Sequence, residues 1–481
     1  MKKRITKNEL LFLLLLFFII GCFKLHERSL ERRNDLHPSQ LHYPPLEFTP
    51  PEPERYVLDN GMIVYLLSDH EIPIISISAI IKTGSVYEPD SKEGLAGITG
   101  EVMRSGGTKF MEPEEINEKL EYVAAHIETS IDRESGSAYL SVLKKDVDLG
   151  LEIFSHILRF PQFRQDKLDI AKQNTIESIR RRNDDPMDIA SREFKKLIYE
   201  GDPRSRVPSI KGIQAIARED LINFHNEYFF PNNIILAVSG DFTHDEILGK
   251  LSVFFGDWKT QDRTIPLAPV PQKKKQGSVI YAERPLPQST IVSGHLGLSK
   301  SHPDFYAFNV LNFILGGGGF SSRLMRQIRS NQGLAYSVGS FYRAEKDYGV
   351  FGTYCFTKSS STGQVIDLIR HILNEVKKEG VTEEELQWAK ESIINKFIFS
   401  FSSSGGLAKK YAYLEYNNLP MDYLKNYCKK IEQVTLFDIK HVADKYLEPQ
   451  NADLVVVGED EHFDQPLSKY GNVTKADLSI Y

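Results

Sequence analysis

The sequence predicts an α+β protein made of two homologous domains, each a β-sheet packed with α-helices, which are related by internal duplication. The first observation is a gapless self-alignment, in which residues 216–241 match residues 434–459 at a constant offset of 218 residues (438 − 220). The second is a shared order of segments: a strand-rich opening, helical stretches, an amphipathic helix, a proline-containing turn and a final apolar strand. Agreement over so long a register indicates duplication of one unit. The identical pairs include Asp220–Asp438, Tyr228–Tyr446, Pro231–Pro449, Asn233–Asn451 and Gly240–Gly458.

The boundaries of the two domains follow from this repeat. We expect an N-terminal domain at residues 51–258, a linker at 259–277 and a C-terminal domain at 278–481. The linker holds three prolines and a lysine triplet and has little hydrophobic period, which is typical of a connecting segment. In both domains the last strand is expected in an apolar run, NIILAVSG in the first and ADLVVVG in the second.

The composition is that of an ordinary globular protein. The chain has 481 residues, of which 41% are hydrophobic and 26% charged, enough for a sizeable core. Its formal charge of −6 provides no general attraction to phosphate backbones, so nucleic acid is not expected as a partner. Because the only cysteines are Cys22, Cys355 and Cys428, a disulfide scaffold and a cysteine-built zinc cluster are excluded. We expect small buried thiols at Cys355 and Cys428, with their pairing left open.

The first residues have the features of a lipoprotein signal peptide. Residues 1–22 begin with a basic stretch and continue with an apolar run, Leu10 to Ile20, which is too short to span a bilayer. The tail ending in Gly21-Cys22 resembles a bacterial lipobox. This resemblance implies a mature chain that begins at lipid-modified Cys22 and is anchored in the periplasm to the inner or outer membrane. Residues 23–50, rich in charge, His and Pro, are expected to be a spacer.

Two segments carry chemical information. No G-x-S-x-G elbow, P-loop or pair of histidines four residues apart occurs in the chain. One informative segment, residues 94–108, reads GLAGITGEVMRSGGT; the other, residues 315–324, reads LGGGGFSSRL and continues through Arg329 to GLAYSV at 333–338. Together with the duplication, they resemble the M16 metallopeptidases, a family that includes mitochondrial processing peptidase, pitrilysin and insulin-degrading enzyme. The resemblance extends from about residue 50 to 460 and implies the two-domain fold described above.

The resemblance implies a degenerate zinc site in the N-terminal domain. In active members the first segment reads G-L-A-H-x-x-E-H, with two His ligands and a Glu that activates water. Here the His positions fall on Gly97 and Glu101, and the general-base position falls on Gly100. The distal Glu ligand falls on Ser178 (178 − 101 = 77 residues on), or on Glu177 if the count differs by one. Since glycine has no donor atom, we expect no catalytic residue, no metal and no cofactor in this chain.

The second segment implies a substrate-binding role for the C-terminal domain. In the family, an Arg and a Tyr seven residues apart face the zinc across a central chamber, and here they are Arg329 and Tyr336. Tyr can donate a hydrogen bond to a developing oxyanion, and Arg can hold a substrate carbonyl. A glycine-rich loop near the chamber entrance is implicated in substrate handling, although the same glycines also suit a simple strand-to-helix turn. Its positions here are Gly316, Gly317, Gly318 and Gly319.

The sequence therefore favours a non-catalytic, substrate-binding subunit of a heterodimeric zinc metallopeptidase. The resemblance to the bacterial two-subunit branch implies a partner that carries H-x-x-E-H and the zinc, and a substrate that is an extended peptide bound by strand addition. The first alternative is a non-enzymatic periplasmic lipoprotein that scaffolds or binds peptides. A second alternative, an autonomous zinc endopeptidase, would require tightly bound zinc in the purified chain.

Overall fold

The computed structural model describes residues 50–274, 276–401 and 403–479. The expected signal peptide at 1–22, the lipidation site Cys22 and all but the last residue of the spacer lie outside the described residues. Within the described part, no helix is both long and apolar enough to cross a membrane.

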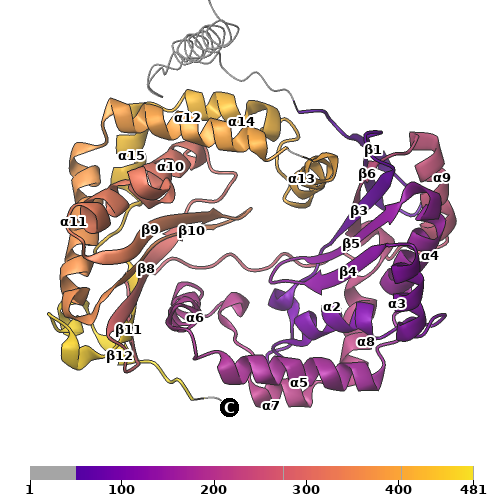
Figure 1. Cartoon of the computed structure of the whole chain (residues 1–481), viewed down its shortest axis with the longest axis horizontal. Helices are drawn as coiled ribbons and strands as arrows, with labels where there is room; N and C mark the ends of the chain where they lie inside the picture. The colour runs from indigo at the N-terminus through magenta and orange to yellow at the C-terminus, as the bar shows by residue number, and fades with distance from the viewer. Residues whose placement is uncertain (1–49, 275, 402, 480–481) are drawn as a thin grey trace, which may run out of the picture. The chain divides into compact units, whose positions relative to one another are not determined.

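A six-stranded mixed sheet lies at the centre of the first half (Figure 1). Its strand order is β1-β2-β6-β3-β5-β4, in which β2 and β6 run parallel and the other neighbours run antiparallel. The last strand of the half by sequence, β6, therefore lies in the middle of the sheet, where all but its final residue are buried. The strands are β1 (Glu54–Val57), β2 (Ile63–Ser68), β3 (Ile74–Ile81), β4 (His126–Ile131), β5 (Gly136–Leu143) and β6 (Ile234–Gly240).

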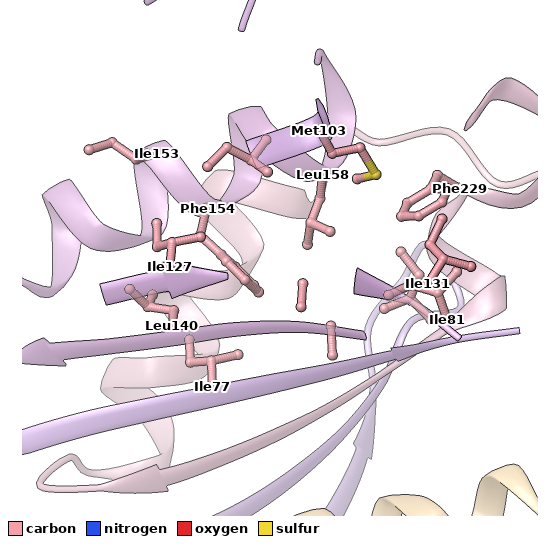
Figure 2. Close-up of a cluster of buried hydrophobic side chains, with 14 of the residues drawn as sticks. Ile77, Ile81, Met103, Ile127, Ile131, Leu140, Ile153, Phe154, Leu158 and Phe229 are labelled. Atoms are coloured by element: carbon pink, nitrogen blue, oxygen red, sulfur yellow. The ribbon is translucent and has the colours of Figure 1, made fainter. Parts of the chain in front are cut away.

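Helices cover one face of this sheet and form the first hydrophobic core. Figure 2 shows Ile77, Ile127 and Leu140 of the strands facing Phe154 and Leu158 of α4. Burial in α4 follows its amphipathic pattern, with apolar residues three and four positions apart turned to the sheet. The helices of this half are α2 (Leu95–Ser105), α3 (Pro113–Tyr122), α4 (Val147–Arg159), α5 (Gln165–Arg181), α6 (Pro186–Ile198), α7 (Ile210–Ala215), α8 (Arg218–Tyr228) and α9 (His244–Phe255).

The second half repeats this sheet. Its order, β12-β7-β11-β8-β10-β9, places β7, β11, β8, β10 and β9 where the first sheet has β2, β6, β3, β5 and β4. The parallel pair recurs as β7 and β11, and the antiparallel neighbour of β11 is β8. Only the outermost position differs, because β12 pairs parallel with β7 whereas β1 pairs antiparallel with β2. The strands are β7 (Val279–Glu283), β8 (Gln288–Gly297), β9 (Ala335–Ala344), β10 (Gly349–Lys358), β11 (Asp453–Gly458) and β12 (Val473–Lys475).

The predicted fold class is confirmed: each half is an α+β unit, and the two share one topology. A second core lies between the second sheet and its helices. Cys355 is buried on β10 and Cys428 is half-buried on α14, and both are free thiols. The helices of this half are α10 (Phe305–Asn312), α11 (Thr362–Glu379), α12 (Glu383–Phe399), α13 (Ser404–Tyr416), α14 (Tyr423–Glu432) and α15 (Leu436–Tyr446).

The two halves exchange one helix each: one helix of each half packs on the sheet of the other half. Helix α6 of the first half packs on β8 and β11 of the second sheet, where Ile189 and Phe194 join a separate buried cluster. Helix α13 of the second half packs on β2, β3 and β6 of the first sheet, where Leu407 and Tyr411 are buried (Figure 1). The two helices lie 218 residues apart (404 − 186), which is the offset of the duplication. Each sheet thus has one face covered by its own helices and the other contacted by the opposite half.

The segment between the halves has no regular structure. From Lys259 to Gly277, no helix or strand occurs among the residues that the structure describes, which leave out residue 275. The segment is held at Pro269, whose carbonyl accepts a hydrogen bond from the buried Arg204 side chain at 2.7 Å.

Candidate functional site

Helix α2 carries the positions at which the resemblance implies zinc chemistry. Leu95, Ile98 and Val102 are buried and turn one face of the helix to the core. The helix starts after Gly94, and the Glu88 carboxylate accepts hydrogen bonds from the Gly94 and Ala96 nitrogens at 3.1 and 2.7 Å. Burial raises the pKa of Glu88 to about 7, although these two hydrogen bonds oppose the rise. The start of α2 is therefore fixed by a carboxyl group that titrates near neutral pH.

The two glycines of α2 lie in different surroundings. Gly97 is exposed, and a Cβ added there would meet nothing within 4 Å. Gly100 is buried against β4, where an added Cβ would lie 2.5 Å from the Ile131 nitrogen. The hydroxyl of Thr129 on the same strand donates to the Gly100 carbonyl at 2.6 Å. The backbone of α2 thus approaches β4 so closely that the general-base position has no room for a side chain.

The remaining positions of the expected site do not supply a ligand set. Glu101 is exposed on α2, and Ser178 is exposed on α5. Glu177 is engaged locally, because it forms an ion pair with Arg180 and accepts a hydrogen bond from Gln173 at 2.9 Å.

Zinc, the metal that the family implies, does not fit the residues present. A catalytic zinc site needs three protein ligands, drawn from His, Cys and carboxylates. In the described part of the chain, no group of three or more such residues is placed to hold a metal ion. At the family positions, Gly97 and Gly100 have no donor atom, and the packing of Gly100 on β4 closes the space for a base.

The glycine-rich segment turns the chain from α10 toward β9. Gly316 is buried, whereas Gly317 and Gly319 are exposed. A side chain at Gly318 would collide with the Trp388 ring of α12 and with Phe313, so the loop lies flat on these two aromatic rings. Glycine is the residue that permits such close approach of backbone to a ring.

A buried ion pair anchors the segment that follows the glycines. Arg323, 7% exposed, donates to both carboxylate oxygens of Glu385 at 2.7 and 2.6 Å. Burial disfavours the Glu385 carboxylate, but the hydrogen bonds from Arg323 and the Thr382 nitrogen, together with the charges of Arg323 and Arg326, outweigh burial and lower the pKa of Glu385. Glu385 also caps the start of α12 by accepting from the Thr382 nitrogen at 3.0 Å. The loop and α12 are therefore tied together by one two-point contact.

Two exposed aromatic side chains and one half-buried arginine meet at the surface beyond this anchor. The Arg329 guanidinium lies 4.9 Å from the ring centre of Phe320 and 5.8 Å from that of Tyr336. Phe320 is 69% exposed and Tyr336 77% exposed, which is far more than aromatic residues usually show. Cation–π attraction to the two rings holds the Arg329 guanidinium in position, and its Nη1 donates to Met325 Sδ at 3.9 Å, which leaves its other donors available for a ligand. We call Phe320, Arg329 and Tyr336 the surface triad.

Tyr336 lies on an edge strand. It is the second residue of β9, which pairs only with β10 and so leaves one row of backbone N–H and C=O groups without a neighbouring strand among the described residues. Such an edge can accept an added strand. The first sheet has the equivalent edge strand in β4, against which α2 packs. The arrangement combines an edge strand with a tyrosine hydroxyl and a guanidinium, groups whose chemistry suits hydrogen bonding to a carbonyl oxygen.

The structure brings some of the sequence-predicted residues together and leaves others apart. Arg329 and Tyr336 are neighbours, and the four-glycine loop leads directly into Phe320, their third member. Sequence reasoning missed Phe320, although an aromatic residue directly after four glycines was a usable signal. It also missed Trp388, which lies 70 residues beyond Gly318 (388 − 318) and gives no local sign of contact with the loop.

Comparison with family models assigns the two halves separately. The model described as insulinase (peptidase family M16) matches residues 63–206, and the model described as peptidase M16 inactive domain matches residues 215–393. The second match includes the glycine-rich loop and the surface triad, and the first includes α2.

Several known proteins are similar to this chain over most of its length. A protein of Rickettsia felis described as an uncharacterised zinc protease is 26% identical over 347 residues, covering 71% of this chain and 82% of its own. The crystal structure of a peptidase M16 inactive domain from Pseudomonas fluorescens has a TM-score of 0.79 at 22% identity, covering 85% of this chain and 98% of that one. The periplasmic protease PqqL of Escherichia coli has a TM-score of 0.73 at 13% identity, covering 88% of this chain and 49% of that one.

Proposed function

The chain belongs to peptidase family M16, and from this membership we propose that it is the non-catalytic, substrate-binding subunit of a heterodimeric zinc metallopeptidase. The complex degrades or processes extended peptides in the periplasm. A partner subunit of the same family carries H-x-x-E-H and supplies the zinc chemistry. The observation that carries the proposal is the contrast between α2, where Gly100 leaves no room for a base, and the surface triad, where Arg329 lies against two exposed aromatic rings.

The surface triad holds the peptide carbonyl in this proposal. The Tyr336 hydroxyl donates a hydrogen bond to the carbonyl oxygen, on which negative charge develops during hydrolysis. Arg329, kept in place between Phe320 and Tyr336, offers a planar set of donors to the same carbonyl or to the next one. Phe320 shields one side of the bound peptide from water.

The edge of β9 supplies the main-chain contacts. An extended peptide that pairs with this strand gains hydrogen bonds that do not depend on its sequence, so such a subunit accepts many peptides. The periplasmic location rests on the expected lipobox at Cys22.

The proposal is tested on the complex that this chain forms with its H-x-x-E-H partner. Tyr336→Phe and Arg329→Ala are each expected to reduce turnover of an extended fluorogenic peptide by about 10²- to 10³-fold, since each removes a donor to the reacting carbonyl. Tyr122→Phe, at a residue 89% exposed at the end of α3, and Arg181→Ala, at an exposed residue on α5, are the matched controls.

Three results bear on the proposal. Full activity in both triad variants, with the complex intact by size-exclusion chromatography, would overturn it. Peptide binding without any partner or turnover would favour the non-enzymatic scaffold instead. About one tightly bound zinc per monomer in the purified chain, with hydrolysis that a chelator abolishes, would establish an autonomous peptidase.

A further inference from the structure

A cavity of about 480 Å³ lies between the exchanged helix α6 and the second sheet. Phe194 and Ile198 of α6 form one wall, and Phe341, Tyr354 and Phe356 of β9 and β10 form the other. Its volume is in the range of sites that bind small ligands or single peptide residues. The site is separate from the surface triad, none of whose members lines it.

The charges around this cavity are unbalanced. Arg133, Lys195 and Arg343 line it, and none of them forms an ion pair with any carboxylate in the described part of the chain. The one acidic residue of the lining is Glu345, and burial raises the pKa of its carboxyl. Burial and the neighbouring Arg133 lower the pKa of Lys195 to about 8, which means that they disfavour its charged form. A bound anion would stabilise that charged form.

The cations are held at the aromatic walls. The Arg133 guanidinium lies 5.4 Å from the ring centre of Tyr199, and that of Arg343 lies 5.5 Å from the ring centre of Phe341. The Lys195 ammonium donates to the Arg206 carbonyl at 3.2 Å, which leaves its other donors available. An occupant that fits these walls has a large apolar or aromatic body and carries a negative charge.

The cavity and the surface triad share a strand. Phe341 and Arg343 follow Tyr336 on β9 by five and seven residues, roughly 17 and 23 Å in an extended strand. Phe356 of the cavity wall pairs in register with Ser337, the residue next to Tyr336. A peptide that pairs with β9 at Tyr336 can therefore reach the cavity with its last residues.

We propose that this cavity binds the carboxyl terminus of the peptide substrate, with the terminal carboxylate between Arg133, Lys195 and Arg343 and a large apolar last side chain among the aromatic rings. This inference rests on the proposed function for its substrate class. It adds a preference for peptides with a free carboxyl end and an apolar last residue.

The test measures binding to the full purified chain by fluorescence polarisation, which needs neither zinc nor hydrolysis. The probe is a labelled decapeptide that ends in phenylalanine, compared with its C-terminal amide and with a version that ends in glycine. Amidation is expected to weaken binding about 10- to 100-fold, as the loss of a charge-assisted hydrogen bond does. In Lys195→Met and Arg343→Gln, the peptide with a free carboxyl end and its C-terminal amide are expected to bind nearly equally. The control Lys211→Met, at an exposed lysine of α7, is expected to keep the difference in affinity between these two peptides.

The outcomes separate this inference from the proposed function. Equal binding of the free-acid peptide and its amide by the wild-type chain would overturn the inference. It would not affect the proposed function, which the turnover of the triad variants tests. Displacement by laurate in the wild-type chain but not in Lys195→Met, without any peptide preference, would also overturn it and assign the cavity to a fatty acid. Tyr336→Phe is expected to keep the preference for the acid, even where it abolishes turnover in the complex.

Discussion

Gly97 and Gly100 occupy neighbouring turns of α2 and differ in what a side chain would meet there. Gly97 opens to free space, whereas Gly100 contacts the backbone of β4. A histidine could be accommodated at the first position, but a glutamate at the second would push the helix off the strand. The packing of α2 on β4 therefore excludes a side chain at the position where the family resemblance implies a general base.

Alanine at these two glycines is expected to act in opposite directions. Gly97→Ala should raise the free energy of unfolding by about 0.5–1 kcal/mol, because alanine favours a helix over glycine and its methyl group meets nothing. Gly100→Ala should lower it by about 1–3 kcal/mol, because the methyl group overlaps the backbone at Ile131. Urea unfolding of the two variants checks this, and equal effects at both positions would contradict it.

Single residues also show how far the sequence reaches. Arg329 and Tyr336 were predicted from a family motif of fixed spacing; the structure places the Arg329 guanidinium 5.8 Å from the Tyr336 ring centre, and their role stays a prediction. Trp388 and Glu385 support the same loop from α12, but their contacts connect residues far apart in sequence, for which a single chain gives no pattern.

At the scale of elements, the start of α2 depends on a carboxyl group buried in an unfavourable place. Glu88 accepts two backbone hydrogen bonds at the positive end of the helix, which favours its charged form. Burial outweighs this and raises the pKa of Glu88 from 4.5 to about 7. The folded chain therefore holds a proton on Glu88 at pH values where the unfolded chain has released it.

This pKa predicts a stability that falls as the pH rises. The contribution of Glu88 is neutral below pH 4.5, turns unfavourable between pH 4.5 and about 7, and is fully unfavourable above that range. The total cost is at most about 3 kcal/mol. Glu88→Gln should flatten the decline over this window while it keeps one acceptor for the helix start. Chemical denaturation at a series of pH values measures it, and an unchanged slope in the variant would contradict the role of Glu88.

Elements also differ in how far the sequence predicted them. The repeated order of strands and helices followed from periodicity and from the 218-residue offset, and the structure confirms the α+β fold of both halves. The exchange of α6 and α13 did not follow, because an amphipathic pattern shows that a helix has a buried face but not which sheet covers it.

At the scale of the whole molecule, the two halves depend on each other. Each sheet contacts a helix of the opposite half, and polar contacts join the same regions. Arg55 of β1 donates to both carboxylate oxygens of Glu415 of α13 at 2.8 and 2.9 Å. Tyr348 of the second half donates to the Glu134 carboxylate of the first at 2.7 Å. We therefore expect residues 50–479 to unfold as one cooperative unit.

The two tryptophans of the chain report on this coupling, because Trp258 packs on the first core and Trp388 on the second. Leu407→Ala, at a residue 2% exposed on α13, should lower the free energy of unfolding by about 2–5 kcal/mol. The transition should shift equally in Trp258→Phe and Trp388→Phe backgrounds, which each leave one reporter. Leu436→Ala, at an exposed leucine of α15, is the control. A shift seen by Trp388 alone would mean that the halves unfold independently.

The most direct test measures peptide hydrolysis by the purified chain with added zinc and then with its H-x-x-E-H partner. It asks whether the partner holds the hydrolytic centre while this chain binds the substrate. We predict no turnover and no stoichiometric zinc for the chain alone, and turnover in the complex that falls with Tyr336→Phe. Turnover by the chain alone, lost on chelation and regained with zinc, would contradict the assignment of the hydrolytic centre to the partner.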